Sequence, residues 1–371
     1  MYLDNAATTP LTVEVKSAIQ SFLNNYGNPS SAHSVGDGAR MKLIESREAV
    51  AKFINANPSE IYFTSGGSAS NNLAIQGWFN KYVGSIFYSP TCHKSIIKQF
   101  TTNDGIMGRC LATNSAAIPL DKGVVDCAKL SDILSDRRGE RHLVVIEYAN
   151  SETGVIQPVD DVIYICHMFG ANVFIDCTGS ISQIQVDVKK LDADMIAFSG
   201  HKLGALKGCG VLYIRDGFEI SPLIYGAQEG GLFGGTENMI GIISLCAAVK
   251  HYDYSSITAN KRDYLWSAIS HSIPKVRWIG GGLPHNLYVV FDGIKGSQLM
   301  TMLDSRGYQV STGSACNSGS PEPSASLVAL KVPEALIHNG IRITLSGDES
   351  FGGLDSFAST LKECVEWLRN E

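Results

Sequence analysis

Short apolar runs alternate with longer helical patterns through the first half of the chain. Runs of strand length lie at residues 60–63, 85–88, 143–146, 173–175, 195–198 and 211–214. Helical patterns begin after two of these runs, near Ser70 and His93. Strands that alternate with helices over short connections form a mostly parallel sheet covered on both faces. The pattern therefore predicts a large α/β domain.

The second half of the chain carries a different pattern. A helical stretch from about residue 240 to 270 leads to new strands at residues 286–291 and 341–345. A helix is predicted between these strands, at residues 297–306. We expect a smaller α+β domain here, on which the first dozen residues pack. The predicted large domain spans residues 13–250, and the predicted small domain spans residues 1–12 and 251–371. The boundary near residue 250 is given to within several residues.

Composition narrows the class of protein. The 371 residues are 44% hydrophobic and 18% charged, as is usual for a globular α/β enzyme. A net charge of −6 argues against nucleic-acid binding. The apolar runs are too short to cross a membrane, and the start lacks the pattern of a signal peptide. Nine scattered cysteines without a Cys-x-x-Cys pair argue against a disulfide framework or zinc site and favour the cytoplasm.

A lysine and an acid stand at the ends of two predicted strands. Lys202 follows the run 195–198, and Asp176 ends the run 173–175. Pyridoxal phosphate (PLP) needs a lysine for its Schiff base and an acid that keeps its pyridine nitrogen protonated. Ligands of such sheets bind at the carboxyl ends of strands, where the loop 64–68 also lies. The sequence therefore predicts a PLP enzyme.

Other polar residues follow predicted strands and have two interpretations each. The glycine-rich turn 64–68 could bind a phosphate at the start of a helix, or could be a flexible helix cap. His93 could stack on the PLP ring and shuttle protons, or could bind backbone at its helix terminus. Asn150 could donate to the phenolic oxygen of the cofactor, or could be a turn asparagine.

Two residues of the second half are further candidates. Cys316 lies among small polar residues at 311–320, which indicates either an exposed, reactive thiol or an incidental surface thiol. Arg342 stands between two isoleucines in the run 341–345, so its side chain projects to the opposite face. Its planar fork suits a carboxylate, although an edge-strand arginine in solvent would give the same pattern.

Together these segments resemble the cysteine desulfurases, PLP enzymes of the class V aminotransferase group. The resemblance runs from Tyr2 to about Leu345 and implies the PLP-dependent transferase fold of the aspartate aminotransferase type. Its most specific motifs lie at residues 27–33, 198–202, 235–238 and 313–316. The last of these is similar to the branch with a long, mobile cysteine loop.

The resemblance implies a role for each candidate. Lys202 would hold PLP, Asp176 would pair with its pyridine nitrogen, and His93 would stack on the ring and help move protons. Asn150 would approach the ring oxygen. The phosphate would be bound by Gly67, Ser68, Ser199 and His201. Thr236 would reach the phosphate of a neighbouring subunit, which implies a homodimer, and Arg342 would hold the substrate carboxylate.

The reaction implied is the conversion of L-cysteine to L-alanine. Freed Lys202 would take the Cα proton, and the Cys316 thiolate would accept the sulfur as a persulfide. An acceptor protein would receive that sulfur, such as an iron–sulfur scaffold or a tRNA-thiolating protein. No metal takes part.

The chain departs from the family pattern at several positions. Gly179 replaces a glutamine, Phe233 an arginine and Ala69 a glutamate. Lost supporting groups often reduce activity because the catalytic residues are then less well held. Alternative functions are therefore another class V activity (selenocysteine lyase, cysteine sulfinate desulfinase or aminotransferase) or a degenerate, non-catalytic homologue that serves as a binding subunit.

Overall fold

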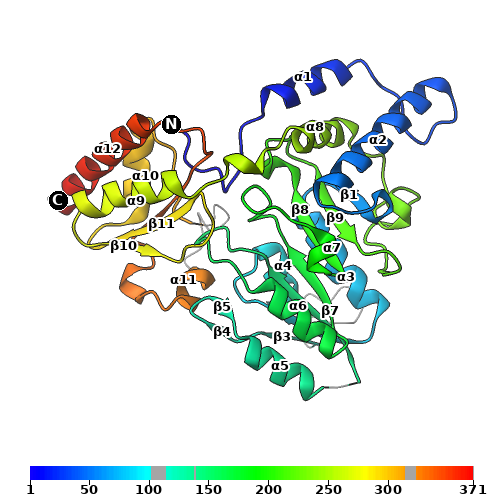
Figure 1. Cartoon of the computed structure of the whole chain (residues 1–371), viewed down its shortest axis with the longest axis horizontal. Helices are drawn as coiled ribbons and strands as arrows, with labels where there is room; N and C mark the ends of the chain where they lie inside the picture. Colours follow the sequence, from blue (N-terminus) through cyan, green and yellow to red (C-terminus); the bar gives the residue numbers. More distant parts are fainter. Residues whose placement is uncertain (102–113, 138, 314–322, 371) are drawn as a thin grey trace.

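A computed structural model describes residues 1–101, 114–137, 139–313 and 323–370 (Figure 1). Its largest feature is a seven-stranded sheet with the order β1-β9-β8-β7-β6-β2-β3. The strands β8, β7, β6, β2 and β3 are parallel, whereas β9 is antiparallel to both of its neighbours. The bounds are β1 (Ile61–Thr64), β2 (Gly84–Tyr88), β3 (Ser115–Ala117), β6 (Arg141–Glu147), β7 (Asn172–Asp176), β8 (Met195–Ser199) and β9 (Gly210–Ile214). The predicted mostly parallel sheet is confirmed.

Helices cover both faces of this sheet, and alternate residues of each strand face opposite sides. In β6, Val144 and Ile146 belong to one core and Leu143 and Val145 to the other. The first core is closed by α1 (Val13–Phe22), α2 (Ser34–Phe53), α5 (Cys127–Ser135), α6 (Val159–Met168), α7 (Val188–Leu191) and α8 (Met239–Lys250). The second is closed by α3 (Gly67–Lys81) and α4 (Lys94–Thr101). Burial on both faces explains why these strands read as continuous apolar runs.

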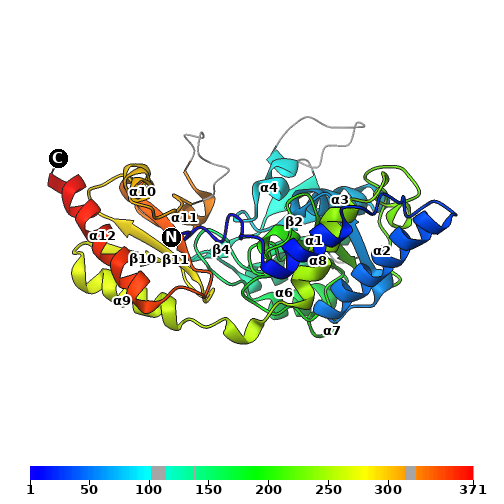
Figure 2. The same ribbon diagram turned by 90° about the horizontal axis from the view of Figure 1, so that it is seen from above.

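A second, antiparallel sheet stands beside the first, as Figure 2 shows from above. It has the order β10-β11-β12, with the bounds β10 (Val276–Ile279), β11 (Asn286–Phe291) and β12 (Gly340–Thr344). Its core is completed by α9 (Asn260–Ser272), α10 (Gly296–Ser305) and α12 (Phe351–Asn370). Leu3 is fully buried in this core, and Asp4 bridges to Thr344. The first residues of the chain therefore pack on its last third.

The smaller elements lie near the junction of the two sheets in Figure 1. They include the hairpin of β4 (Leu120–Asp121) and β5 (Val124–Val125), and the short helix α11 (Ala325–Ala329). Within the described ranges, no helix combines the length and apolar character needed to cross a membrane.

The single helical stretch predicted for residues 240–270 is wrong. Two helices, α8 and α9, are separated by residues 251–259, which include a 3-10 turn over Tyr254–Ser256. The hydroxyls of Tyr252 and Tyr254 donate to the backbone carbonyls of Ser182 and Ile181. These tertiary bonds hold the connection against the large sheet, and the hydropathy pattern carries no signal for them.

Two glycines of α2, Gly36 and Gly38, allow a matched test of how closely this helix packs against the turn that precedes it. A Cβ at Gly36 would lie 2.4 Å from the carbonyl oxygen of Ser31, whereas a Cβ at Gly38 would meet nothing within 4 Å. We expect Gly36→Ala to lower the free energy of unfolding by about 1–3 kcal/mol through overpacking. Gly38→Ala should raise it by about 0.5–1 kcal/mol. Urea denaturation at one fixed protein concentration measures both, and equal effects would contradict the packing described.

Candidate active site

Asp176 ends β7 and is 4% exposed. One carboxylate oxygen accepts the backbone N–H of Thr178 at 2.8 Å, and the other accepts Nδ2 of Asn71 at 2.8 Å. Asn71 belongs to α3, so this bond joins the strand end to the helix that starts at the glycine-rich turn. Hydrogen bonds to both oxygens fix the plane of the carboxylate.

His93 directly precedes α4 and lies within electrostatic range of Asp176 and Lys202. Burial lowers the pKa of His93, the Asp176 carboxylate opposes that shift, and the charges of Lys202 and Lys94 add to it. The structure therefore brings together the lysine, acid and histidine that the sequence singled out. Because its pKa lies below the ordinary value, His93 is neutral at neutral pH.

Lys202 ends the 3-10 turn Gly200–Lys202 that follows β8. Its ammonium group donates to the backbone carbonyls of Ala6 and Ala7, the latter at 2.9 Å. Thr9 binds the carbonyl of His201 through both its N–H and its hydroxyl, at 3.1 and 2.8 Å. The N-terminal segment is thus tied to the turn that carries the lysine.

Three of the predicted phosphate-binding residues, Gly67, Ser68 and Ser199, lie at the start of α3. Gly67 is the first residue of this helix, and a Cβ there would lie 3.0 Å from Thr178 Oγ1 and 3.4 Å from Ser199 Cβ. Thr178 Oγ1 is buried without a hydrogen-bond partner among the described residues. His201 has its pKa lowered to about 4, first by burial and then by the charges of Lys202 and Lys207. A helix N-terminus with a buried, unpaired hydroxyl beside it suits a phosphate ester.

Glu147 holds the loop that leads to His93. It ends β6 and pairs in register with Asp176, and its carboxylate accepts Thr91 Oγ1 at 2.5 Å and Cys92 Sγ at 2.9 Å. Burial raises the pKa of both Glu147 and the Cys92 thiol. Cys92 is therefore an inert donor that fixes the approach of the chain to His93.

Asn150 is a turn residue with every polar atom engaged. Its Oδ1 accepts the backbone N–H groups of Glu152 and Thr153 at 3.1 and 3.0 Å, as in an Asx turn. Its Nδ2 donates to the carbonyl of Thr91 at 3.1 Å and to Ser326 Oγ at 3.0 Å. The turn interpretation thus describes the contacts seen, and contact with a cofactor oxygen remains a proposal.

Glu152 contacts the residues on both sides of the segment 314–322, namely Gly313 before it and Ser324 after it. Its carboxylate accepts Ser324 Oγ at 2.6 Å, and a Cβ at Gly313 would lie 2.4 Å from its Oε1. Burial raises the pKa of Glu152, while Ser324, the charge of Arg342 and Ser326 oppose that shift. Glycine at 313 is required for so close an approach. Cys316 itself lies outside the described residues.

Arg342 is 2% exposed, so the solvent-exposed interpretation is wrong. Its guanidinium forms an ion pair with Asp4 at 2.7 Å and donates to the carbonyl of Ser151 at 3.1 Å, while Nε has no partner among the described residues. Its backbone pairs with Ser311 through bonds of 2.6 and 3.1 Å. The chain that leads toward Cys316 is therefore anchored on this arginine.

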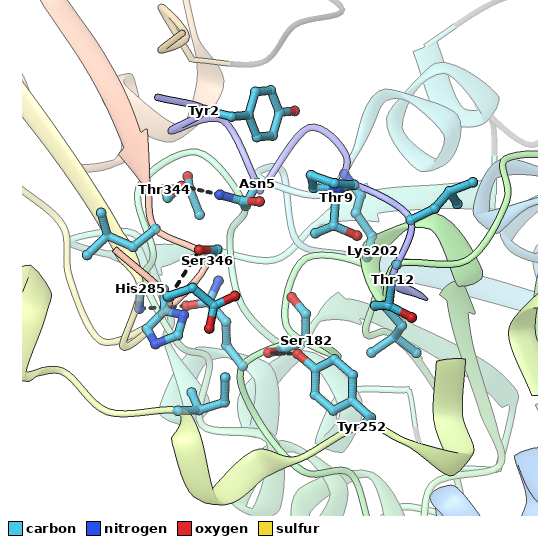
Figure 3. Close-up of a pocket in the computed structure, with 18 of the residues that line it drawn as sticks. Tyr2, Asn5, Thr9, Thr12, Ser182, Lys202, Tyr252, His285, Thr344 and Ser346 are labelled. Carbon is cyan, nitrogen blue, oxygen red and sulfur yellow. Dashed lines mark hydrogen bonds between the residues drawn. The ribbon is translucent and has the colours of Figure 1, made fainter. Parts of the chain in front are cut away.

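A cavity of about 520 Å³ reaches Lys202 from the side of the N-terminal segment. Figure 3 shows Thr9 and Lys202 on one side of it and Thr344 on the other. His93 and Asp176 are not among the residues that line it. Lys202 thus lines this cavity and also lies within electrostatic range of His93.

The structure shows the surroundings of Gly179 and Phe233, two positions at which the chain departs from the family pattern. A Cβ at Gly179 would lie 2.8 Å from the carbonyl oxygen of Ala149 and 3.1 Å from Ser151 Cβ. A glutamine at 179 would thus displace the turn that carries Asn150. Phe233 packs against the core under α3, and Thr236 is exposed between Phe233 and α8.

Comparison with known proteins identifies the family. The family model for aminotransferase class-V matches residues 1–357. Over its whole length the chain is 35% identical to cysteine desulfurase IscS of Methanosarcina thermophila, covering 93% of that protein. It is also 36% identical to cysteine desulfurase IscS of Dictyoglomus turgidum, covering 95% of it.

Two solved structures are similar to this chain in fold and sequence over most of its length. A NifS-like protein matches with a TM-score of 0.88 and 31% identity over 99% of both chains. A structure described as SspA in complex with cysteine matches with a TM-score of 0.79 and 29% identity, over 94% of this chain and 99% of that one. The chain belongs to the class V aminotransferases and, within them, to the cysteine desulfurase family. The predicted fold, the predicted enzyme class and PLP as cofactor are confirmed.

The residues present fit PLP. Asp176 offers a carboxylate whose oxygens are both oriented, Lys202 offers an amine, and the orphan hydroxyl of Thr178 faces the start of α3 beside Gly67. Thr178 and Asn71 were not predicted as site residues. Thr178 stands two residues after Asp176, a spacing that could have drawn attention to it.

Removing the hydroxyl of Thr178 tests this cradle. We expect Thr178→Val to weaken PLP binding about fivefold, the effect of one hydrogen bond of about 1 kcal/mol. Thr178→Ser keeps the hydroxyl and should bind PLP like the unmodified protein. Equilibrium dialysis of PLP against the PLP-free proteins measures the effect. Equal affinities for the valine and serine variants would exclude contact between this hydroxyl and the cofactor.

Proposed function

We propose that the protein is a cysteine desulfurase that converts L-cysteine to L-alanine and transfers the sulfur to Cys316 as a persulfide. The observation that carries this proposal is the anchoring of both flanks of residues 314–322 beside Arg342. Ser311 pairs with the backbone of Arg342, and Glu152 contacts Gly313 and Ser324. Both ends of the segment that contains Cys316 are therefore held close to the arginine that would bind the substrate.

When bound, PLP supplies an electron sink that weakens the bonds at Cα of the amino acid. The chain supplies the groups around it. Asp176 would hold the pyridine nitrogen, and Gly67, Ser68, Ser199 and His201 would bind the phosphate. Asn150 would approach the ring oxygen in exchange for one of its bonds to Thr91 or Ser326. The placement of Asp176 and Gly67 described above and the neutral state of His201 support the other roles.

The substrate groups would be handled by Arg342 and Lys202. Arg342 would exchange Asp4 for the carboxylate of cysteine, since a buried guanidinium pairs strongly with a planar anion. Lys202 would take the proton from Cα and later return a proton to carbon. The Cys316 thiolate would attack the substrate sulfur, so that the S–S bond forms as the Cβ–S bond breaks. Cysteine and one protein thiol thereby become alanine and one persulfide.

The partners remain part of the proposal. The exposed Thr236 would reach the phosphate in the neighbouring subunit of a homodimer. The persulfide would pass to an iron–sulfur scaffold or a tRNA-thiolating protein.

A cytoplasmic location fits the described cysteines, all of which are free thiols: Cys92, Cys127, Cys166, Cys177, Cys209, Cys246 and Cys364. We further propose residues 13–250 as the large domain and 1–12 with 251–371 as the small one.

Replacing the proposed sulfur acceptor tests the function. We expect Cys316→Ala to abolish release of sulfide from L-cysteine while the protein still binds cysteine. A desulfinase or an aminotransferase does not need this thiol. Sulfide assays with dithiothreitol, paired with alanine quantification, make the measurement. Sulfide release by Cys316→Ala at the rate of the unmodified protein would refute the proposal.

Glu152 offers a second test, at the base of the Cys316 segment. Glu152→Ala removes the acceptor of Ser324, and we expect it to slow persulfide formation roughly tenfold, the scale of a lost buried hydrogen bond to a charged group. Glu152→Gln still accepts this bond and should lose much less. Alkylation of the persulfide followed by mass spectrometry of the Cys316 peptide measures the rate. The alanine and glutamine variants should bind cysteine equally, and equal persulfide rates would contradict the anchoring role.

A further inference from the structure

A hydrogen-bonded relay of described residues joins Asp176 to His93. Nδ2 of Asn71 donates to Asp176 Oδ2 at 2.8 Å and to Ser95 Oγ at 2.9 Å. Ser95 Oγ lies 2.8 Å from Nδ1 of His93, and the backbone N–H of Ser95 donates to the same nitrogen at 3.1 Å. Asn71 is 1% exposed, so water does not replace its bonds.

The direction of each bond follows from the charge on Asp176. The reverse orientation of the Asn71 amide would place an oxygen against the carboxylate, acceptor against acceptor, so Nδ2 must face Asp176. The two hydrogens of Nδ2 then serve Asp176 and Ser95. The backbone N–H of Ser95 can only donate, so Nδ1 of His93 accepts it, and the hydroxyl hydrogen of Ser95 then points to the same nitrogen.

Nδ1 of His93 therefore accepts from both the hydroxyl and the backbone N–H of Ser95. A nitrogen that accepts hydrogen bonds carries no proton, so the proton of the neutral ring is on Nε2. Protonation of the ring would place a proton on Nδ1, which would break the bond from the backbone N–H of Ser95 and oblige the Ser95 hydroxyl to turn from donor to acceptor. The charged groups facing His93 are Asp176 from β7, Lys202 from the turn after β8, and Lys94 from its own helix.

We propose that Ser95 and Asn71 are positioning residues that hold His93 in its neutral, Nε2-protonated form, so that it serves the reaction as a hydrogen-bond donor at Nε2 and not as a base there. The inference rests on the proposed function in assigning His93 to that reaction. A ring without a lone pair at Nε2 cannot accept the Cα proton at that nitrogen. This work therefore falls to Lys202.

Removing the Ser95 hydroxyl tests the relay. Ser95→Ala deletes one of the two bonds that favour a bare Nδ1, and we expect the proton affinity of His93 to rise about fivefold, the effect of one hydrogen bond. Ser95→Thr retains the hydroxyl and is the matched control. The readout is ¹⁵N NMR of histidine-labelled, PLP-loaded protein across pH, with the His93 signals identified from their loss in His93→Gln.

The relay predicts that Nδ1 of His93 gives the signal of an acceptor nitrogen and Nε2 that of a protonated one. Ser95→Ala should titrate at higher pH than both the unmodified protein and Ser95→Thr. A proton on Nδ1, or a Ser95→Ala variant that titrates like the unmodified protein, would overturn the inference.

Asn71→Ala extends the test to the next member of the relay. The effects of Asn71→Ala and Ser95→Ala on His93 should be less than additive in the double variant, because part of the effect of the amide reaches the ring through the Ser95 hydroxyl. Additive effects would refute the coupling. The NMR measurement needs no cysteine, so a protein without desulfurase activity would refute the proposed function while the state of His93 is still measured.

Discussion

The site depends on the buried carboxylate of Asp176 and on the hydrogen bonds that orient it. A lone buried carboxylate would be costly, and the bonds from Asn71 and from the backbone of Thr178 offset that cost. The same bonds tie β7 to α3 and, through Ser95, to the start of α4. One anion thus sets the relative positions of the strand end, the helix beside the glycine-rich turn, and His93.

The N-terminal segment connects this site to the second sheet. Asp4 pairs with the buried Arg342, and the carbonyls of Ala6 and Ala7 accept from Lys202. These contacts engage both cationic side chains that the proposed mechanism uses. Binding of cofactor and substrate would therefore exchange protein partners for ligand groups, so the cations are held in place without being left unpaired.

The sequence predicts residues whose position on a strand end implies their role. Asp176 and Lys202 follow apolar runs, and parallel strands place such ends at one edge of the sheet. The burial of Arg342 and its pairing with Asp4 could not be predicted, because the partners are 338 residues apart. Glu152 and Ser95 were missed for a related reason. Each acts through side chains whose proximity the fold creates, and neither stands in a pattern of its own.

The break between α8 and α9 and the strand β10 were also missed. The first depends on bonds from Tyr252 and Tyr254 to distant carbonyls, and the second is a short strand with partly exposed residues. By contrast, the helices predicted to begin near Ser70 and His93 correspond to α3 and α4, which pack on the large sheet. Local pattern thus determines the elements that bury a face, and tertiary hydrogen bonds determine the connections between them.

The visible absorption spectrum of the purified protein, before and after addition of L-cysteine, shows whether PLP is bound and whether cysteine reacts with it. We expect a yellow protein, with PLP bound through Lys202, whose spectrum changes on addition of L-cysteine. A yellow protein that ignores cysteine would contradict the proposed substrate. A colourless protein that cannot be reconstituted with PLP would contradict the catalytic account as a whole.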